Sequence, residues 1–174
     1  MAERDRQQRF DAQLREHRGI VLKVASLYAR GVEDRDDLAQ EIYVQLWRSF
    51  ERYDPTRAKF STWLYRIALN VAISHLRRGS DAWSGRLEPL EPHHLETIGN
   101  APENEPDERL TALYSLIGQL DALNRALILL YLEDRSYAEI AEILGISETN
   151  VATKIARVKQ RLRSQMTSVA ATGA

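Results

Sequence analysis

The chain of 174 residues contains no cysteine, and glycine and proline are scarce, with eight and five residues respectively. Without cysteine there can be no disulfide framework and no thiolate metal site. The scarcity of glycine and proline, together with many helix-favouring residues, predicts an all-α protein. No apolar run approaches the length of a membrane span, so we expect no membrane segment and a cytoplasmic location.

The net charge of −1 conceals a strong sorting of charge along the chain. Residues 55–78 hold five basic residues and no acid, and residues 147–174 hold five basic residues against one acid. Residues 31–54 and 79–108 are acidic, with seven and eight acids against three and one basic residues. This alternation predicts two contacts with a polyanion and one with a different partner, although any single block could equally be a solvated helix face.

Four of the five prolines fall in residues 79–107, where acids are frequent and apolar periodicity is weak. This composition predicts a flexible acidic linker between two small helical domains. The domains are expected at residues 1–78 and 108–166, and the small polar residues of 167–174 predict a disordered tail.

Apolar residues at helical spacing predict the individual helices on either side of the linker. Gly31 is expected to end the first helix, Asp36 and Asp37 to begin the second, and Ser61 to cap the third. The predicted helices cover residues 10–29, 36–52, 61–78, 107–117 and 121–132.

The segment from Ser136 to Leu162 carries the local signals of two helices joined by a tight turn. Ser136 and Glu139 form a capping box, Gly145 can end the helix in the left-handed conformation, and Ser147 can cap the next helix. That helix repeats apolar residues at Val151, Ile155, Val158 and Leu162. A short helix, a glycine turn and a longer basic helix are typical of a helix-turn-helix that docks in the major groove. The alternative is a plain amphipathic helix of a bundle.

The outer side of this last helix supplies candidate DNA contacts. Thr149, Thr153 and Arg157 lie opposite the apolar stripe near the N-terminal end, where this motif meets base edges. Arg157 could donate two hydrogen bonds to a guanine. Phosphate contacts are expected from the flanking residues Asn150, Lys154, Lys159, Arg161 and Arg163.

Two blocks of sequence resemble one protein family. The block SYAEIAEILGISETNVATKIARVKQRL, residues 136–162, resembles region 4 of bacterial RNA polymerase sigma factors. The blocks DLAQEIYVQLWRSF and FSTWLYRIALNVAISHLRR, within residues 36–78, resemble region 2. In this order, around a short linker, they resemble the extracytoplasmic-function (ECF) group of the sigma-70 family. The resemblance implies a factor that binds core polymerase, recognises the −35 and −10 promoter elements and starts transcription.

The resemblance also implies roles by position. The second predicted helix would bind the clamp helices of the polymerase's largest subunit through Asp37, Gln40, Glu41, Tyr43 and Trp47. On the same polar side, Val44 would be an exposed apolar anchor. Region 4 would bind the −35 element through the recognition helix, and it would contact the flap of the second-largest subunit. An anti-sigma factor is a further implied partner.

The third predicted helix and the loop before it resemble the part that captures the −10 element as single strands. We expect Phe60 to be a core residue and Asn70 to be the best candidate for reading a flipped base. The matching positions are Lys59, Phe60, Ser61, Thr62, Trp63, Arg66 and Asn70. Arg77 and Arg78 would touch phosphates of the upstream duplex.

The chain departs from the family at two places. Arg66 and Ile67 stand where housekeeping factors carry a Trp-Trp pair that wedges into the DNA fork, which implies weaker melting and stricter promoter choice. Ala152 stands where many relatives carry a basic residue, which leaves the −35 sequence open. The linker matches a segment that threads toward the RNA exit channel, although a plain tether is an equal interpretation.

No catalytic constellation or phosphate-binding glycine loop is present, so we expect neither an enzyme nor a cofactor. His93, His94 and Glu96 lack a fourth ligand, which argues against a metal site. Two alternatives to a sigma factor stay open. One is a polymerase-independent helix-turn-helix regulator, and the other is an adaptor or anti-sigma antagonist that binds polymerase but no DNA.

Overall fold

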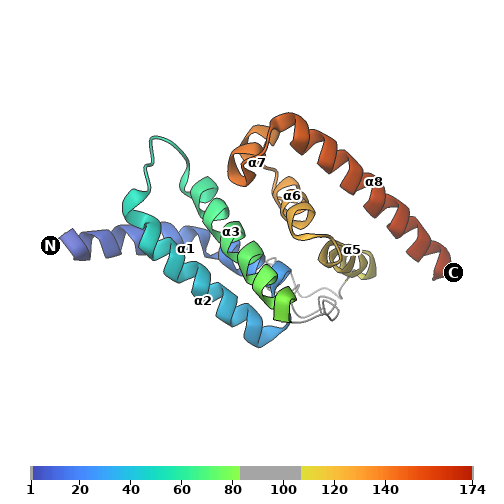
Figure 1. Ribbon diagram of the computed structural model, residues 1–174, viewed down its shortest axis with the longest axis horizontal. Coiled ribbons are helices and arrows are strands. Elements are labelled where there is room, and N and C mark those ends of the chain that lie inside the picture. Colours follow the sequence, from blue (N-terminus) through green and yellow to red (C-terminus); the bar gives the residue numbers. More distant parts are fainter. Residues whose placement is uncertain (1, 83–106, 174) are drawn as a thin grey trace. The chain divides into compact units, whose positions relative to one another are not determined.

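A computed structural model describes residues 2–82 and 107–173 of the chain, and both stretches are built from α-helices without strands (Figure 1). The helices form two compact units, one in each stretch. The predicted all-α fold with two small helical units is thereby confirmed. The central part of the predicted linker and the residues His93, His94 and Glu96 lie outside the described residues.

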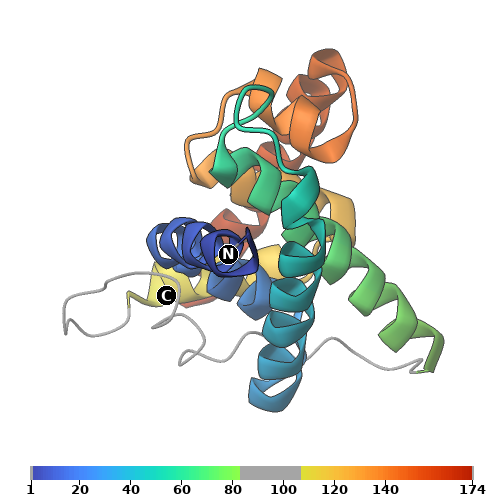
Figure 2. The ribbon, with the colours of Figure 1, turned by 90° about the vertical axis from the view of Figure 1, so that its left-hand side faces the viewer.

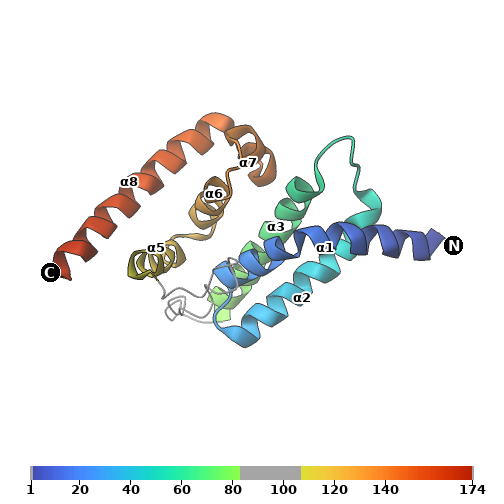
Figure 3. The same cartoon turned by 180° about the vertical axis from the view of Figure 1, so that it is seen from behind.

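The first unit consists of three long helices, α1 (Ala2–Tyr28), α2 (Val32–Ser49) and α3 (Phe60–Ala82), and a 3-10 turn, η1 (Phe50–Arg52). Each long helix packs against the other two, and α1 crosses α2 and α3 in Figure 3. Their apolar stripes meet in one core, which buries most of the predicted stripe residues. Fully buried side chains include Val21, Val24, Leu38, Ile42, Leu46 and Leu64.

An aromatic cluster closes one end of this unit. Phe50 packs edge-on against Phe10 at 5.2 Å between ring centroids, and Tyr53 lies 5.0 Å from Trp63. Phe60 is buried against the same rings, as expected for a core residue. The turquoise loop of residues 53–59 leaves the unit at this end (Figure 2). The cluster therefore anchors both ends of the loop that precedes α3.

The second unit consists of α5 (Glu108–Gly118), α6 (Ala122–Leu132), α7 (Tyr137–Leu144) and α8 (Glu148–Thr172). The first three helices all pack against α8, which runs along the whole unit (Figure 1). Val151, Ile155, Val158 and Leu162 form the buried stripe of α8, as predicted.

The turn of the predicted helix-turn-helix is set by local capping bonds. Ser136 Oγ accepts a hydrogen bond from the backbone N–H of Glu139, and Ser147 Oγ accepts one from that of Asn150, both at 3.1 Å. Gly145 adopts the left-handed conformation, with φ of 69°, and ends α7. The two helix starts and the glycine turn expected from the sequence are confirmed because short-range signals determine them.

Several predicted helix boundaries are wrong. Helix α1 begins at Ala2 rather than near residue 10, and α2 begins at Val32, so its first-turn acids are Glu33 and Asp34. Gly31 precedes α2 as its N-cap residue, with φ of 129°. Ser61 is a buried residue inside the first turn of α3 and not its cap.

The predicted domain limits also need correction at two places. Helix α3 continues through residues 79–82, which the sequence assigned to the linker. Helix α8 continues to Thr172, so residues 167–172 are helical and not a disordered tail. Small and hydroxyl-bearing residues suggested a disordered end. In the structure, three of these hydroxyls instead donate hydrogen bonds to carbonyls one turn earlier within α8. The donors are Thr167, Ser168 and Thr172.

Candidate functional site

Helix α8 presents one polar face opposite its buried stripe. Six of the eight residues of α8 predicted to bind DNA lie on this face, at helical angles within about 140° of one another. They are Thr149, Asn150, Thr153, Lys154, Arg157 and Arg161. In the described part of the chain Lys154, Arg157 and Arg161 form no ion pair. The structure therefore brings most of the predicted recognition residues together with their charges uncompensated.

Lys159 and Arg163 lie outside this face, and Lys159 also has a partner within the unit. Its ammonium donates a hydrogen bond to the hydroxyl of Tyr131 at 3.1 Å and lies 4.9 Å from the centre of that ring. Lys159 thus contacts α6 on the flank of α8, away from the polar face. Local sequence patterns do not indicate this contact, because Tyr131 lies 28 residues away.

Helix α3 carries a second exposed stripe. Lys59, Arg66, Asn70 and Arg77 are spaced by seven, four and seven residues, so they share one side of α3 and its N-terminal extension. All four are exposed. Asn70 also lines a shallow hollow with Ile67 and Val71 of α3 and Gln45 of α2. The stripe therefore joins three cations to one amide at the edge of a partly apolar hollow.

Three other residues predicted to contact single strands lie differently. Ser61 and Thr62 are buried, with 9% and 6% of their surface exposed, so their hydroxyls have little access to a ligand. Trp63 is half-buried in the aromatic cluster, 6.2 Å from Phe50. The prediction for Ser61 and Thr62 is not supported by this arrangement, because these positions face the core at the start of α3.

Helix α2 exposes a mixed polar and apolar face. Asp37 and Gln40 are exposed, Val44 is 49% exposed, and Glu41 is half-buried between this face and α3. Residues three or four apart share a helix face, which explains why Asp37, Glu41 and Val44 align. Four of the six residues expected to bind polymerase therefore form one surface.

Tyr43 and Trp47 lie on the side of α2 that faces α1. The Trp47 ring packs against Phe10 at 5.3 Å, and the guanidinium of Arg6 lies 4.2 Å above it. Arg6 also donates to the Trp47 carbonyl at 2.9 Å and pairs with Glu51 at 2.7 Å. Tyr43 borders a hollow with Asp11, Leu14, Arg15 and Arg18 of α1. Both aromatic residues thus contribute to packing within the unit.

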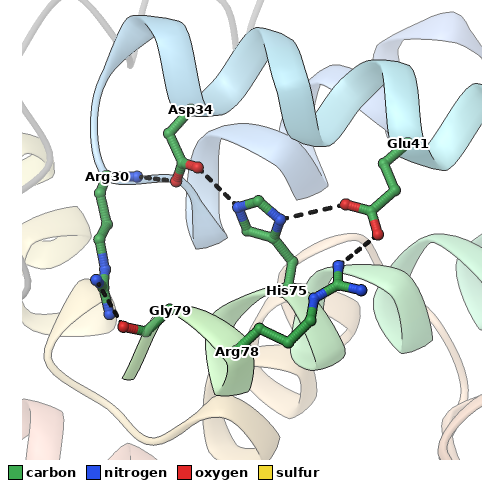
Figure 4. Close-up of polar contacts among 6 residues, drawn as sticks. All are labelled: Arg30, Asp34, Glu41, His75, Arg78 and Gly79. Atoms are coloured by element: carbon green, nitrogen blue, oxygen red, sulfur yellow. Dashed lines mark hydrogen bonds and ion pairs between the residues drawn. The ribbon is translucent and has the colours of Figure 1, made fainter. Parts of the chain in front are cut away.

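A polar cluster that was not expected from the sequence joins α2 to α3 (Figure 4). His75 lies between two carboxylates, with Nε2 2.7 Å from Asp34 Oδ1 and Nδ1 3.2 Å from Glu41 Oε2. Arg78 donates to the other oxygen of Glu41 at 2.5 Å. Asp34 in turn accepts from the backbone N–H of Arg30 at 2.8 Å. The carboxylates that contact His75 lie 34 and 41 residues away in sequence, so local sequence patterns cannot predict these contacts.

The electrostatics of this cluster favour an ionised Glu41. Partial burial raises the pKa of Glu41, but hydrogen bonds and charges from Arg78 and His75 outweigh it and hold that pKa below its usual value. Both ring nitrogens of His75 lie within hydrogen-bond distance of a carboxylate, so the imidazole bridges Asp34 and Glu41.

The described residues contain no group of three histidine or acidic side chains with the geometry of a metal site. Likewise, no helix in the described stretches is long and apolar enough to cross a membrane.

Two family models match the chain. The model of sigma-70 region 2 matches residues 14–81, which span most of the first unit, and the model of sigma-70 region 4 matches residues 110–162 of the second unit. The two exposed basic stripes and the α2 face all lie within these matches.

Relatives and a solved structure agree with the family models. The chain is 31% identical to the ECF RNA polymerase sigma factor SigW of Bacillus subtilis, over 78% of this chain and 76% of that protein. It is 30% identical to the ECF sigma factor SigE of Mycolicibacterium smegmatis, over 90% of this chain and 61% of that protein. The fold resembles the sigma factor RpoE of Bartonella quintana, with a TM-score of 0.74 at 18% identity, covering 92% and 98% of the two chains. The chain therefore belongs to the ECF sigma factors of the sigma-70 family.

Proposed function

We propose that this protein is a promoter-recognition subunit that binds core RNA polymerase through α2, reads the −35 element with α8 and captures the −10 element along α3. The observation that carries this assignment is the presence of two exposed cationic stripes, one in each helical unit, together with an acidic face on α2 of the first unit. Nucleic-acid phosphates attract exposed cations, and an acidic face cannot serve that purpose.

The α8 face fits a major groove. Its N-terminal turns offer hydroxyls and one guanidinium, from Thr149, Thr153 and Arg157, at the positions that meet base edges in this motif. Lys154 and Arg161 flank them and suit phosphates. Lys159 is left out of this proposal, because its ammonium is held by Tyr131.

The α3 stripe fits a single strand. Lys59 and Arg66 can contact phosphates of the strand, Arg77 can contact those of the upstream duplex, and Asn70 offers both a donor and an acceptor beside the apolar walls of its hollow. A base rotated out of the duplex requires a surface of this kind. The buried hydroxyls of Ser61 and Thr62 would instead fix the start of α3.

The α2 face fits a protein partner. Asp37, Gln40 and Glu41 surround Val44, so an apolar contact is bordered by charges and hydrogen-bonding groups, as is common in interfaces. We assign no catalytic step to the chain, because RNA synthesis belongs to the polymerase. We further propose that it acts in the cytoplasm and is held by an anti-sigma factor, as the Bartonella RpoE is in its complex with NepR.

Reconstituted transcription tests the proposal. Core polymerase mixed with the full chain and a randomised promoter library should yield transcripts from templates that share one −35 and one −10 sequence. Core polymerase without the chain is the control and should select neither. A lack of chain-dependent transcripts would refute the assignment, and tight sequence-specific DNA binding by the chain alone would favour a polymerase-independent regulator.

Two substitutions test the division of labour, and each serves as the control for the other. Arg157→Ala should relax base preference at the −35 element by about 5- to 150-fold, which corresponds to about 1–3 kcal/mol, and should leave preference at −10 intact. Asn70→Ala should relax base preference at the −10 element and should leave preference at −35 intact. If both variants change the same element, the assignment of one helix to each element is wrong.

A further inference from the structure

Glu41 is shared between two surfaces of the first unit. It belongs to the exposed face of α2, between Asp37 and Val44, yet both of its carboxylate oxygens are engaged with α3. Arg78 takes one oxygen at 2.5 Å, and His75 lies 3.2 Å from the other. The residue therefore connects the proposed polymerase surface to the C-terminal part of α3.

The geometry holds Glu41 toward α3. His75 is hydrogen-bonded to Asp34, and Asp34 accepts a hydrogen bond from the backbone N–H of Arg30. The imidazole is therefore held in place between α2 and α3 (Figure 4). The Glu41 carboxylate is charged near neutral pH, and the contacts with Arg78 and His75 lower its pKa further. A fixed negative charge is thus presented to Arg78.

This contact has a consequence for Arg78. The guanidinium is 64% exposed, so it stands within reach of an external ligand, but its charge is compensated by Glu41. A phosphate that binds Arg78 must displace or share that carboxylate. By contrast, Arg66 on the same helix is exposed and has no acidic partner in the described part of the chain.

We propose that Glu41 is an internal counter-ion that withholds Arg78 from DNA in the free protein, and that a basic group of the polymerase releases Arg78 by taking Glu41. This inference rests on the proposed function, which places polymerase on α2 and DNA on α3. The Glu41 carboxylate can pair with Arg78 or with the polymerase, but not with both. Polymerase binding therefore frees Arg78 for a phosphate, and phosphate binding to Arg78 frees Glu41 for the polymerase. The coupling is reciprocal by thermodynamic necessity.

The expected effect is modest. Exposed ion pairs contribute little, so the Glu41–Arg78 pair should lower the affinity of the free chain for DNA by about two- to fivefold. A pair of this strength can be opened by a partner without unfolding the unit. The alternative is that the cluster only fastens α2 to α3, in which case Arg78 contacts no phosphate once Glu41 is neutralised.

Salt-dependent binding of the full chain to a short fluorescent duplex separates the two cases. Glu41→Gln keeps the shape of the side chain but removes its charge. It should increase the affinity about two- to fivefold, and it should steepen the slope of log Kobs against log salt by about 0.9, as expected for one added phosphate contact. Asp37→Asn is the matched control, because it removes the same charge one turn away without touching Arg78.

The Glu41→Gln/Arg78→Ala double variant assigns the effect to its residue. We expect it to lose the steeper slope and to return to the wild-type value. The inference is overturned if Glu41→Gln has the same slope as Asp37→Asn, or if the steeper slope persists in the double variant. Circular dichroism of each variant shows that the helices are intact.

A second arm uses core polymerase. In the complex, Glu41→Gln should give no further gain in binding of promoter DNA, because the polymerase already occupies Glu41 in the wild type. A gain of the same size with and without polymerase would overturn the release step. Failure of wild-type protein to support transcription would instead refute the proposed function, so the two failures are distinguishable.

Discussion

The two helical units reach similar all-α folds by different means. In the second unit the elements are defined by contacts three or four residues apart, such as the Ser136 and Ser147 caps and the Gly145 turn. The first unit relies on side chains far apart in sequence, with Arg6 bound to Glu51 across 45 residues. Locally specified structure leaves side chains on the surface free for ligands, whereas long-range pairs occupy them. This difference is consistent with Lys154, Arg157 and Arg161 of α8 forming no ion pair in the described part of the chain, whereas Arg78 is paired with Glu41.

The largest expected contrast lies between two arginines. Arg125 in α6 is 2% exposed and donates to the carbonyls of Gly118 and Leu120 at 2.7 and 3.0 Å. Arg125→Met leaves buried acceptors without a charged donor and should lower the free energy of unfolding by about 3 kcal/mol. Arg6→Met, which removes a surface pair, should lower it by about 1 kcal/mol. Urea titrations measure both, and equal losses would contradict the comparison.

The same substitution at two glycines should have opposite signs. Gly145 has φ of 69°, so Gly145→Ala forces an alanine into the left-handed region and should destabilise the second unit by about 1–2 kcal/mol. Gly19 lies inside α1 with open space around it, and Gly19→Ala should stabilise the first unit by about 0.5–1 kcal/mol. Thermal unfolding of both variants tests this. Shifts of the same sign would rule out backbone conformation as the cause.

The cap serines should each contribute a smaller amount. Ser136→Ala and Ser147→Ala remove the acceptors of the first turns of α7 and α8, and each should lower the free energy of unfolding by about 1 kcal/mol. Ser164→Ala, at an exposed position within α8, is the matched control and should have no measurable cost. A comparable loss at Ser164 would show that the caps are not the source of the effect.

Lowering the pH should reduce the stability of the first unit through protonation of Glu41, and this is the smallest of the expected effects. Because the pKa of Glu41 is lowered in the folded state, its contribution is complete above the ordinary value of 4.5 and is lost as pH falls through the lowered pKa. Glu41→Gln should flatten the acidic part of the plot of unfolding free energy against pH. Fluorescence of Trp47 and Trp63 reports on this unit, and an unchanged acid limb in the variant would contradict the assignment.

The sequence predicted the parts of the fold that short-range chemistry determines. The all-α class, the two units, the α7–α8 turn and the buried stripe of α8 follow from capping residues and periodicity. The polar face of α8 was also predictable, since a helix with a known buried side has a known outer side. The ends of α1, α3 and α8 were not, because tertiary packing and hydroxyl back-bonding extend helices through sequences that look terminal.

Four of the predicted site residues lie in surroundings that local sequence patterns do not indicate. Ser61 and Thr62 are buried, Lys159 is held by Tyr131, and Glu41 is held by Arg78. Burial and long-range partners decide how accessible such a side chain is to a ligand. Residue type and helical angle predict what a side chain can bind, but not whether it is already engaged.

The hydrogen bond made by the Thr153 hydroxyl limits which base contacts the proposed recognition helix can make. Its Oγ1 donates to the carbonyl of Thr149 at 3.0 Å, so its single proton is committed while its lone pairs remain open. At a base edge such a hydroxyl can accept from the amino groups of adenine or cytosine, and its methyl can meet that of thymine. It has no proton to offer guanine O6 or N7. If α8 binds the −35 element as proposed, the hydrogen bond from Thr153 to the backbone restricts Thr153 to an acceptor role, and a contact to guanine would have to come from Arg157.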